Sequence, residues 1–155
     1  MKPKLIQAYM ATARIFAELS HARRLHVGAI VVKEDRIISI GYNGMPAGWD
    51  NNCEDEIQYP DAEGIILKTK PEVLHAERNA LDKLAKGNEG GAGSTMFVTH
   101  APCLECAKSI YGAGIVEVFY NEDYRSEDGI QFLKKCGVKI SKLDISSGQS
   151  NTGIK

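Results

Sequence analysis

The sequence contains no long apolar run and no excess of charge of one sign. None of its apolar stretches approaches the ~18 residues that a membrane-spanning helix needs, and the N-terminal segment has neither a continuous apolar core nor a signal-cleavage site. Lys and Arg number 19 against 20 Asp and Glu, so no general polyanion-binding surface is indicated. We therefore expect a cytoplasmic protein that binds neither a membrane nor nucleic acid.

Cysteine is scarce as well. The four cysteines, Cys53, Cys103, Cys106 and Cys136, are too few and too unevenly spaced for a disulfide framework in a chain of 155 residues. Burial or metal ligation is therefore the expected use of these thiols. The length suits one domain with one core, so any function must fit in a single site, repeated only by oligomerisation.

Apolar periodicity predicts alternating helices and strands in a single domain over residues 1–145. The expected elements are a helix at 4–19, a β-hairpin at 27–44, a helix at 71–86, a strand at 94–100, a helix at 104–114, a strand at 115–120, a helix at 126–137 and a strand at 138–144. This order predicts an α/β fold, with a mixed sheet of about five strands and helices on both faces.

Two segments show no such periodicity. Residues 50–70 are polar and acid-rich, and we expect an irregular insertion that packs on the domain or on a neighbouring subunit. Residues 146–155 are expected to form a mobile tail.

The stretch VLHAERNAL at 73–81 places an imidazole and a carboxylate in a predicted helix. In mid-helix His75 and Glu77 would point about 200° apart and could not share a face. Both can serve one pocket only in the first turn, and Pro71, a residue type favoured just inside a helix start, puts them near it. A solvated helix start is the plain alternative.

A second motif, PCLEC at 102–106, puts Cys103 and Cys106 at the start of another predicted helix. Residues three apart share a helix face, and a helix N-terminus stabilises thiolates, so the pair is suited to hold a metal. With His75 it gives zinc three protein ligands and leaves the fourth position to water, which is typical of a catalytic site. A structural zinc site with a further histidine ligand, a redox pair, and two unrelated core cysteines are the alternatives.

Glu77 then acquires a chemical role. A carboxylate beside zinc-bound water takes a proton and passes it to a ring nitrogen and then to a leaving amine, which is hydrolytic deamination. The pattern H-x-E followed by P-C-x-x-C is the signature of zinc nucleobase deaminases. HAE at 75–77 and PCLEC at 102–106 match that pattern in order.

Three segments together resemble one family, namely 23–48 (RRLHVGAIVVKEDRIISIGYNGMPAG), 75–81 (HAERNAL) and 101–120 (APCLECAKSIYGAGIVEVFY). The family is the deoxycytidylate (dCMP) deaminases of the cytidine-deaminase-like superfamily, especially those encoded by phages. The resemblance implies a cytidine-deaminase-like three-layer α/β/α fold and a hydrolase that converts dCMP to dUMP and ammonia for thymidylate synthesis.

The resemblance also implies roles for individual residues. His75, Cys103 and Cys106 would hold one catalytic Zn²⁺ per subunit, and Glu77 would be the proton shuttle. The implied substrate contacts are Asn43 for the deoxyribose, the main chain at Ala76, His100 and Ala101 for the cytosine edge, and Arg23, Arg24, Tyr120, Tyr124 and Arg125 as candidates for the 5′-phosphate. A nucleotide dianion does require cationic and hydroxyl donors. Surface charge for the arginines, packing for the tyrosines and a turn role for Asn43 are the alternatives.

Regulation is a further implication of the resemblance. Family members are commonly homohexamers that dCTP activates and dTTP inhibits, with Mg²⁺ accompanying the nucleotide. Tyr42, Asn43, Gly44 and the acidic insertion would line that allosteric site. Each effector would have to bind the active and inactive states with different affinity.

Two features depart from the family pattern. Some phage relatives hold a second, structural zinc through a cysteine and histidines in the insertion, but no histidine lies between Cys53 and His75 here. We therefore predict a single zinc per subunit. His100 stands where many relatives have a small hydroxyl or apolar residue, and its imidazole is expected to narrow the pocket or contact the substrate.

Other functions remain open at this point. A free cytidine or deoxycytidine deaminase shares the zinc motifs, and so does a tRNA adenosine deaminase, which the balanced charge disfavours. A non-catalytic module that binds nucleotides on the same fold is the alternative outside the enzymes. Glu77 beside a three-ligand site argues against that module, because a structural metal needs neither an open position nor a carboxylate.

Overall fold

A computed structural model describes residues 1–61 and 63–145, so the tail expected to be mobile lies outside the described residues. Its elements are α1 (Pro3–Ala17), β1 (Gly28–Lys33), β2 (Arg36–Tyr42), β3 (Glu54–Ile57), β4 (Ile66–Thr69), α2 (Ala76–Ala85), β5 (Thr95–His100), α3 (Leu104–Gly112), β6 (Glu117–Glu122), α4 (Asp128–Lys135) and β7 (Lys139–Lys142). No helix among the described residues is long and apolar enough to cross a membrane.

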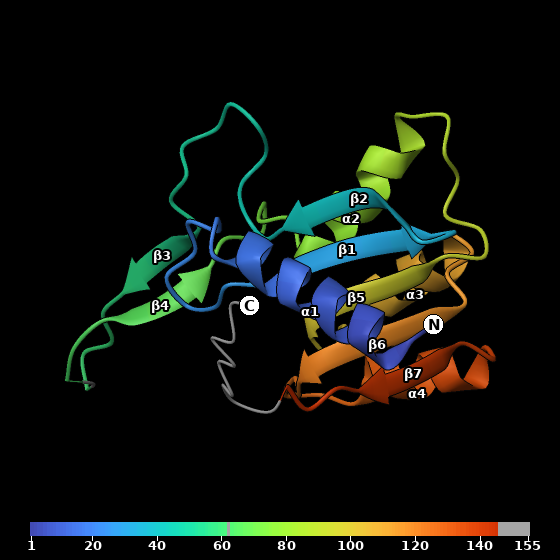
Figure 1. The fold of residues 1–155 in the computed structure, drawn as a ribbon. Coiled ribbons are helices and arrows are strands. Elements are labelled where there is room, and N and C mark those ends of the chain that lie inside the picture. The colour runs from blue at the N-terminus through green and yellow to red at the C-terminus, as the bar shows by residue number, and fades with distance from the viewer. Residues whose placement is uncertain (62, 146–155) are drawn as a thin grey trace, which may run out of the picture.

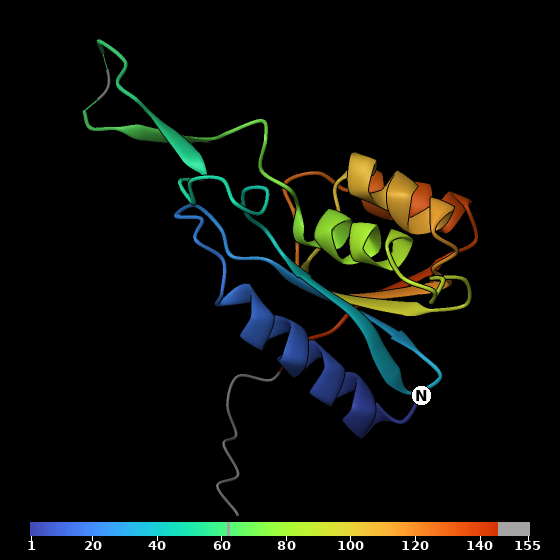
Figure 2. The ribbon, with the colours of Figure 1, turned by 90° about the horizontal axis from the view of Figure 1, so that it is seen from above.

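The main sheet has five strands in the order β2-β1-β5-β6-β7. Strand β1 runs antiparallel to β2 and β5, whereas β5, β6 and β7 run parallel to one another. Helix α1 covers one face, and α2, α3 and α4 cover the other (Figures 1 and 2). The predicted three-layer α/β/α fold with a mixed sheet is thereby confirmed.

The central strands are buried on both faces because their alternate side chains enter two separate apolar clusters. In β1, Ala29 and Val31 pack under α2 and α3, whereas Ile30 and Val32 pack under α1. Such strands read as continuous apolar runs rather than as alternating patterns. The β1–β2 hairpin turns through Glu34 and Asp35, whose φ angles are 51° and 56°, and this left-handed pair suits the twist of a tight hairpin.

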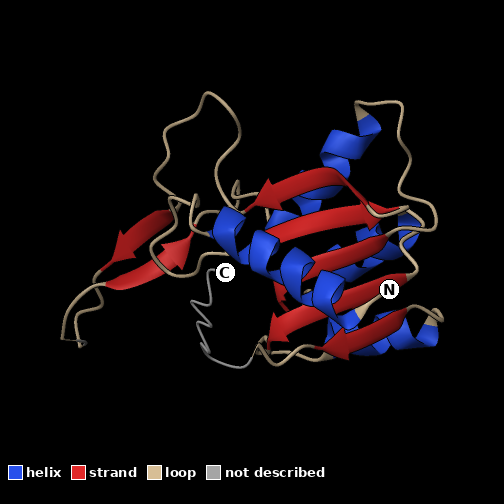
Figure 3. Cartoon of the chain, in the orientation of Figure 1, coloured by secondary structure: helices blue, strands red, loops and turns tan. Residues whose placement is uncertain are grey.

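The insertion at 50–70 is more regular than predicted. Strands β3 and β4 pair antiparallel, from Glu54 opposite Thr69 to Ile57 opposite Ile66. The hairpin projects from the body as a separate two-stranded sheet (Figure 3). Of the residues in these two strands only Glu54 is buried, so the sequence carries none of the apolar alternation by which half-buried strands are recognised.

The predicted start of the second helix at Pro71 was wrong, since α2 begins at Ala76. The preceding residues are committed to other backbone contacts. Leu74 exchanges two hydrogen bonds with Gly44, of 2.8 and 3.1 Å, in an isolated antiparallel bridge. A helical Leu74 would have to give up this bridge, so the helix starts only after it.

Candidate metal centre and substrate pocket

The N-termini of α2 and α3 meet at one point. His75 and Cys103 are the N-cap residues of the two helices, and both have extended backbones. His75 Nδ1 lies 3.3 Å from Cys106 Sγ and 3.7 Å from Cys103 Sγ. The three ligand atoms lie within 4.8 Å of one another. Cys103 and Cys106 thus form one cluster with His75, which lies far from them in the sequence.

This cluster fits a zinc ion. Zinc bonds of about 2.05 Å to nitrogen and 2.3 Å to sulfur, at tetrahedral angles, set the nitrogen and sulfur ligands about 3.6 Å apart. The two Nδ1–Sγ distances, 3.3 and 3.7 Å, bracket that value. Three ligands of the N,S,S type leave one coordination position open, as a catalytic zinc requires.

The electrostatics of the cluster also suit a cation. Hydrogen bonds from Cys106 and His75 lower the pKa of Cys103 to about 4, so one thiolate is present even without a metal. The hydrogen bond to Cys103, together with burial, raises the pKa of Cys106. The hydrogen bond to Cys103 raises the pKa of His75. His75, Cys103 and Cys106 would hold a dication with both cysteines as thiolates, and its charge would take the place of the protons that these groups share.

Glu77, in the first turn of α2, lies beside the cluster. Its side chain is only 4% exposed and lines the same cavity as His75 and Cys103. Burial raises the pKa of Glu77, which makes its carboxylate a stronger proton acceptor. The first turn is the place from which both His75 and Glu77 can face one pocket.

Two glycines allow the helices to carry the ligands this close to the sheet and to each other. A Cβ on Gly41 of β2 would lie 2.3 Å from the Ala76 carbonyl oxygen, so α2 touches the strand there with its first turn. A Cβ on Gly129 of α4 would lie 2.1 Å from the Pro102 carbonyl oxygen, directly before Cys103. A larger residue at either position would push a ligand-bearing segment away.

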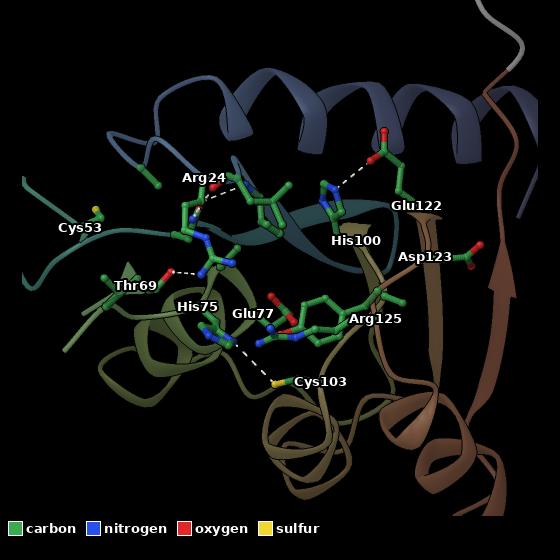
Figure 4. A pocket seen from close by; sticks show the side chains of 18 of the residues that line it. Arg24, Cys53, Thr69, His75, Glu77, His100, Cys103, Glu122, Asp123 and Arg125 are labelled. Carbon is green, nitrogen blue, oxygen red and sulfur yellow. Dashed lines mark hydrogen bonds and ion pairs between the residues drawn. The ribbon is translucent and has the colours of Figure 1, made fainter. Parts of the chain in front are cut away.

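A cavity of about 450 Å³ opens in front of the cluster. Figure 4 shows His75, Glu77 and Cys103 on one side of it, and Arg24 and His100 on the other. The remaining lining residues are Ala22, Leu25, Val27, Asn43, Cys53, Glu54, Thr69, Val73, Ala76, Ala101, Glu122, Asp123, Tyr124 and Arg125. The volume matches the range for small-molecule sites.

Comparison with known families agrees with this geometry. Residues 3–122 match the model of the cytidine and deoxycytidylate deaminase zinc-binding region. The chain belongs to this deaminase family.

Individual relatives cover most of the chain. The ComE operon protein 2 of Bacillus subtilis is 36% identical over 142 residues, which is 90% of this deaminase and 71% of that protein. Human deoxycytidylate deaminase is 40% identical over 124 residues, 77% of this deaminase and 66% of the human enzyme. The crystal structure of the cyanophage S-TIM5 dCMP deaminase in complex with dCMP and dUMP is 45% identical. The match covers 92% of this deaminase and 99% of the cyanophage chain, with a TM-score of 0.82.

Ten of the residues singled out in the sequence line the cavity of this deaminase. They are Arg24, Asn43, His75, Ala76, Glu77, His100, Ala101, Cys103, Tyr124 and Arg125. Cys106 is buried and is not among the lining residues. Arg23, Tyr120, Tyr42 and Gly44 are not among the lining residues.

The two neighbouring arginines point to different partners. The guanidinium of Arg23 donates to Glu56 at 2.8 Å and lies 3.6 Å from Glu54, so it is used by the β3–β4 hairpin. Among the described residues the Arg24 guanidinium donates only to the Thr69 hydroxyl, at 3.2 Å, and Arg24 lines the cavity. Arg125 stacks over the Tyr124 ring, 5.4 Å from its centroid.

Asn43 holds the backbone of the loop before β1. Its Oδ1 accepts from Val27 N at 2.8 Å, and its Nδ2 donates to Leu25 O at 2.7 Å. The turn role and the pocket position therefore coexist in one residue. Tyr42 accepts a hydrogen bond from Asn79 of α2 through its carbonyl, and Gly44 forms the bridge to Leu74.

Sequence reasoning missed several residues of the site. Gly41 was detectable, because a glycine inside a strand signals a close backbone approach. Glu54, Thr69, Glu122 and Asp123 also line the cavity, but no motif contains them. Cys53 lies at the cavity wall, with its Sγ 3.4 Å from the Asn51 carbonyl oxygen. All four cysteines are free thiols.

Proposed function

We propose that the protein converts dCMP to dUMP and ammonia. The observation that carries the proposal is the pairing of two features in one cavity. A three-ligand N,S,S centre with an open position stands beside the buried Glu77, and Arg24 and Arg125, which have no carboxylate partner among the described residues, line the same cavity. The first feature suits hydrolytic deamination of a cytosine, and the second suits a 5′-phosphate.

In this mechanism the chain's own groups bind the base and move protons. Zinc, held by His75, Cys103 and Cys106, supplies an activated water when it is bound. Glu77 accepts one proton from the attacking water and delivers it to the ring nitrogen next to the amine, as the water oxygen bonds to the ring carbon. It then accepts the second proton of that oxygen and passes it to the amine, which leaves as ammonia when the C–N bond breaks and the carbonyl forms. Its raised pKa suits both directions of transfer.

The base edge is recognised by main-chain groups. The first N–H groups of a helix have no acceptor within that helix, so the Ala76 N–H at the start of α2 is available to the pyrimidine carbonyl. The Ala101 N–H already donates to the Glu122 carbonyl at 2.8 Å. Ala101 therefore offers its carbonyl oxygen, which suits the amine of cytosine better than the carbonyl of uracil.

The phosphate and sugar contacts are assigned to other residues that line the cavity. Arg24 and Arg125 provide the cationic donors, with the Tyr124 hydroxyl beside them. Asn43 also lines the cavity and keeps one amide hydrogen for the deoxyribose. Arg23 and Tyr120, which do not line the cavity, are not part of this assignment.

Regulation and assembly are proposed separately. We propose a homohexamer in the cytoplasm, with dCTP as activator and dTTP with Mg²⁺ as inhibitor at Tyr42, Asn43 and Gly44. Support comes from two contacts that link this loop to the start of α2. The Asn79 amide donates to the Tyr42 carbonyl at 2.7 Å, and Gly44 pairs with Leu74, next to His75. An effector that shifts the loop would shift a zinc ligand.

The test follows the loss of cytosine absorbance after addition of zinc-loaded protein to dCMP, deoxycytidine and dCTP separately. Each reaction is run with and without dTTP and Mg²⁺. The proposal requires turnover of dCMP well above that of the other two, and the regulatory part requires suppression by dTTP. Equal turnover of deoxycytidine would remove the phosphate assignment, and silence on all three would remove the deaminase assignment.

A further inference from the structure

The rim of the cavity carries three carboxylates besides Glu77. Glu54, Glu122 and Asp123 line the same cavity as Arg24 and Arg125. An uncompensated carboxylate at this rim repels a phosphate dianion and weakens its attraction to the arginines. The partner of each carboxylate therefore bears directly on the affinity for a phosphorylated substrate.

Two of the three carboxylates are held by groups that are always available. Glu54 Oε1 accepts from the backbone N–H groups of Arg23 and Arg24, at 2.8 and 3.3 Å. Asp123 Oδ2 lies 2.8 Å from Lys142 Nζ. Both carboxylates thus have a donor that does not depend on a histidine, and Glu54 Oε2 also lies 3.6 Å from Arg23 Nε.

Glu122 depends on a histidine instead. Its Oε2 lies 2.8 Å from His100 Nε2, and this ring is the only ion-pair partner that Glu122 has among the described residues. The Glu122 side chain is 65% exposed, whereas that of His100 is 13% exposed. Without the ring, nothing in this part of the chain would fix the direction of that carboxylate.

The His100 ring is held in turn by a hydrogen-bond chain through Thr99. The Gly28 N–H donates to Thr99 Oγ1 at 3.1 Å, and Thr99 Oγ1 lies 3.2 Å from His100 Nδ1. When the hydroxyl donates its own proton to Nδ1, the remaining ring hydrogen sits on Nε2 and points at Glu122. The register of β5 and β6 places His100 directly opposite Glu122, so the contact joins two strand ends.

We propose that His100 sets the preference for a phosphorylated substrate by holding the Glu122 carboxylate away from the anion position between Arg24 and Arg125. The inference rests on the proposed function, since it assumes a 5′-phosphate at that rim. His100 acts through Glu122 and is a positioning residue. The direction of the effect is the same for either protonation state, because a neutral ring orients the carboxylate and a charged ring also compensates it.

The experiment measures how much the phosphate adds to binding. Zinc-loaded protein is titrated calorimetrically with dUMP and with deoxyuridine, and the ratio of the two Kd values gives the phosphate contribution. The variants are His100→Ala, His100→Gln, Glu122→Gln and the double variant His100→Ala with Glu122→Gln. Zinc content is measured for each, and KM and kcat for dCMP are determined alongside.

The proposal requires a specific pattern of ratios. His100→Ala lowers the phosphate contribution about fivefold and raises KM for dCMP more than it lowers kcat. The double variant restores the ratio, because an amide at 122 does not repel the phosphate. In His100→Gln, which keeps a side-chain donor, the phosphate contribution falls by less than in His100→Ala.

Other patterns would overturn it. A double variant as impaired as His100→Ala would show that the ring acts by packing or by direct substrate contact. The Glu122→Gln variant leaves His100 intact. If its phosphate contribution fell to the level of His100→Ala, repulsion between the Glu122 carboxylate and the phosphate could not be the cause. Failure of the proposed function appears separately, as equal Kd values for dUMP and deoxyuridine in the unaltered protein.

Discussion

The metal-binding wall of the cavity and its arginine-bearing rim are built in different ways. His75 and Cys103 are the N-caps of two helices, and Glu77 lies in the first turn of one of them; both helices are packed against the sheet through a core of buried residues. Arg24 and Arg125 come from segments outside the helices and strands, and their guanidinium groups contact a hydroxyl and an aromatic ring. The wall is fixed by backbone geometry, whereas the rim is fixed by side-chain contacts.

This difference separates what each region can do. A metal ligand must be placed to within a fraction of an ångström, which packed helix termini achieve and flexible side chains do not. A phosphate is attracted over a longer range, and exposed arginines can move to meet it. We therefore expect changes in the wall to abolish chemistry and changes at the rim to alter affinity.

The largest effect is expected from removal of zinc. A strong chelator should abolish turnover, and zinc analysis of the untreated protein should give one zinc per chain. Cys103→Ser should lose zinc, because a hydroxyl is a poor replacement for a thiolate ligand. Cys136→Ser, which changes a cysteine outside the cluster, is the matched control and should keep it. Two zincs per chain would contradict the single-site prediction and direct attention to Cys53.

Replacement of Glu77 should leave the wall intact and remove its proton path. Glu77→Gln is expected to retain zinc and to bind dUMP, while kcat falls about 10³-fold, equivalent to about 4 kcal/mol in the barrier. Kinetics of dCMP turnover and zinc content are the two measurements. Activity within tenfold of the unaltered protein would rule out Glu77 as the shuttle.

The contact between α2 and β2 should respond to a single methyl group. In Gly41→Ala the new Cβ would meet the Ala76 carbonyl oxygen and the Ala80 nitrogen at 2.3 and 2.5 Å. We expect the free energy of unfolding to fall by about 2–3 kcal/mol, measured by denaturant titration. Gly112→Ala, where a Cβ would have nothing within 4 Å, is the control and should be neutral or slightly stabilising. Equal stability of both variants would show that α2 does not depend on this close approach.

The smallest effects are expected at the rim. Arg24→Ala and Arg125→Ala should each raise KM for dCMP about tenfold, or about 1.4 kcal/mol, with a smaller change in kcat. Arg23→Ala is the matched control, because its guanidinium contacts Glu54 and Glu56, and KM should change less than twofold. A comparable rise in the control would return Arg23 to the phosphate site.

Local patterns were enough to predict most of the fold. The hairpin over 27–44, the later strands and their helices appear where apolar periodicity put them, since each of these elements packs on a core and carries a 2.0 or 3.6 residue period. The strands of the insertion were not predicted, because β3 and β4 project from the body and do not pack on the core. The predicted start of α2 was wrong because the bridge between Gly44 and Leu74 joins two segments that no local periodicity connects.

The sequence by itself was enough to predict the candidate zinc ligands and the acid beside them, because His75, Glu77, Cys103 and Cys106 lie in two short motifs at the starts of helices. Only the tertiary structure decided which arginine faces the cavity and which carboxylates surround it. Arg23 and Arg24 are neighbours with the same chemistry, and their directions differ because Glu54 and Glu56 lie beside one and Thr69 beside the other. Contacts between distant segments make that distinction, and no residue pattern within one segment records it.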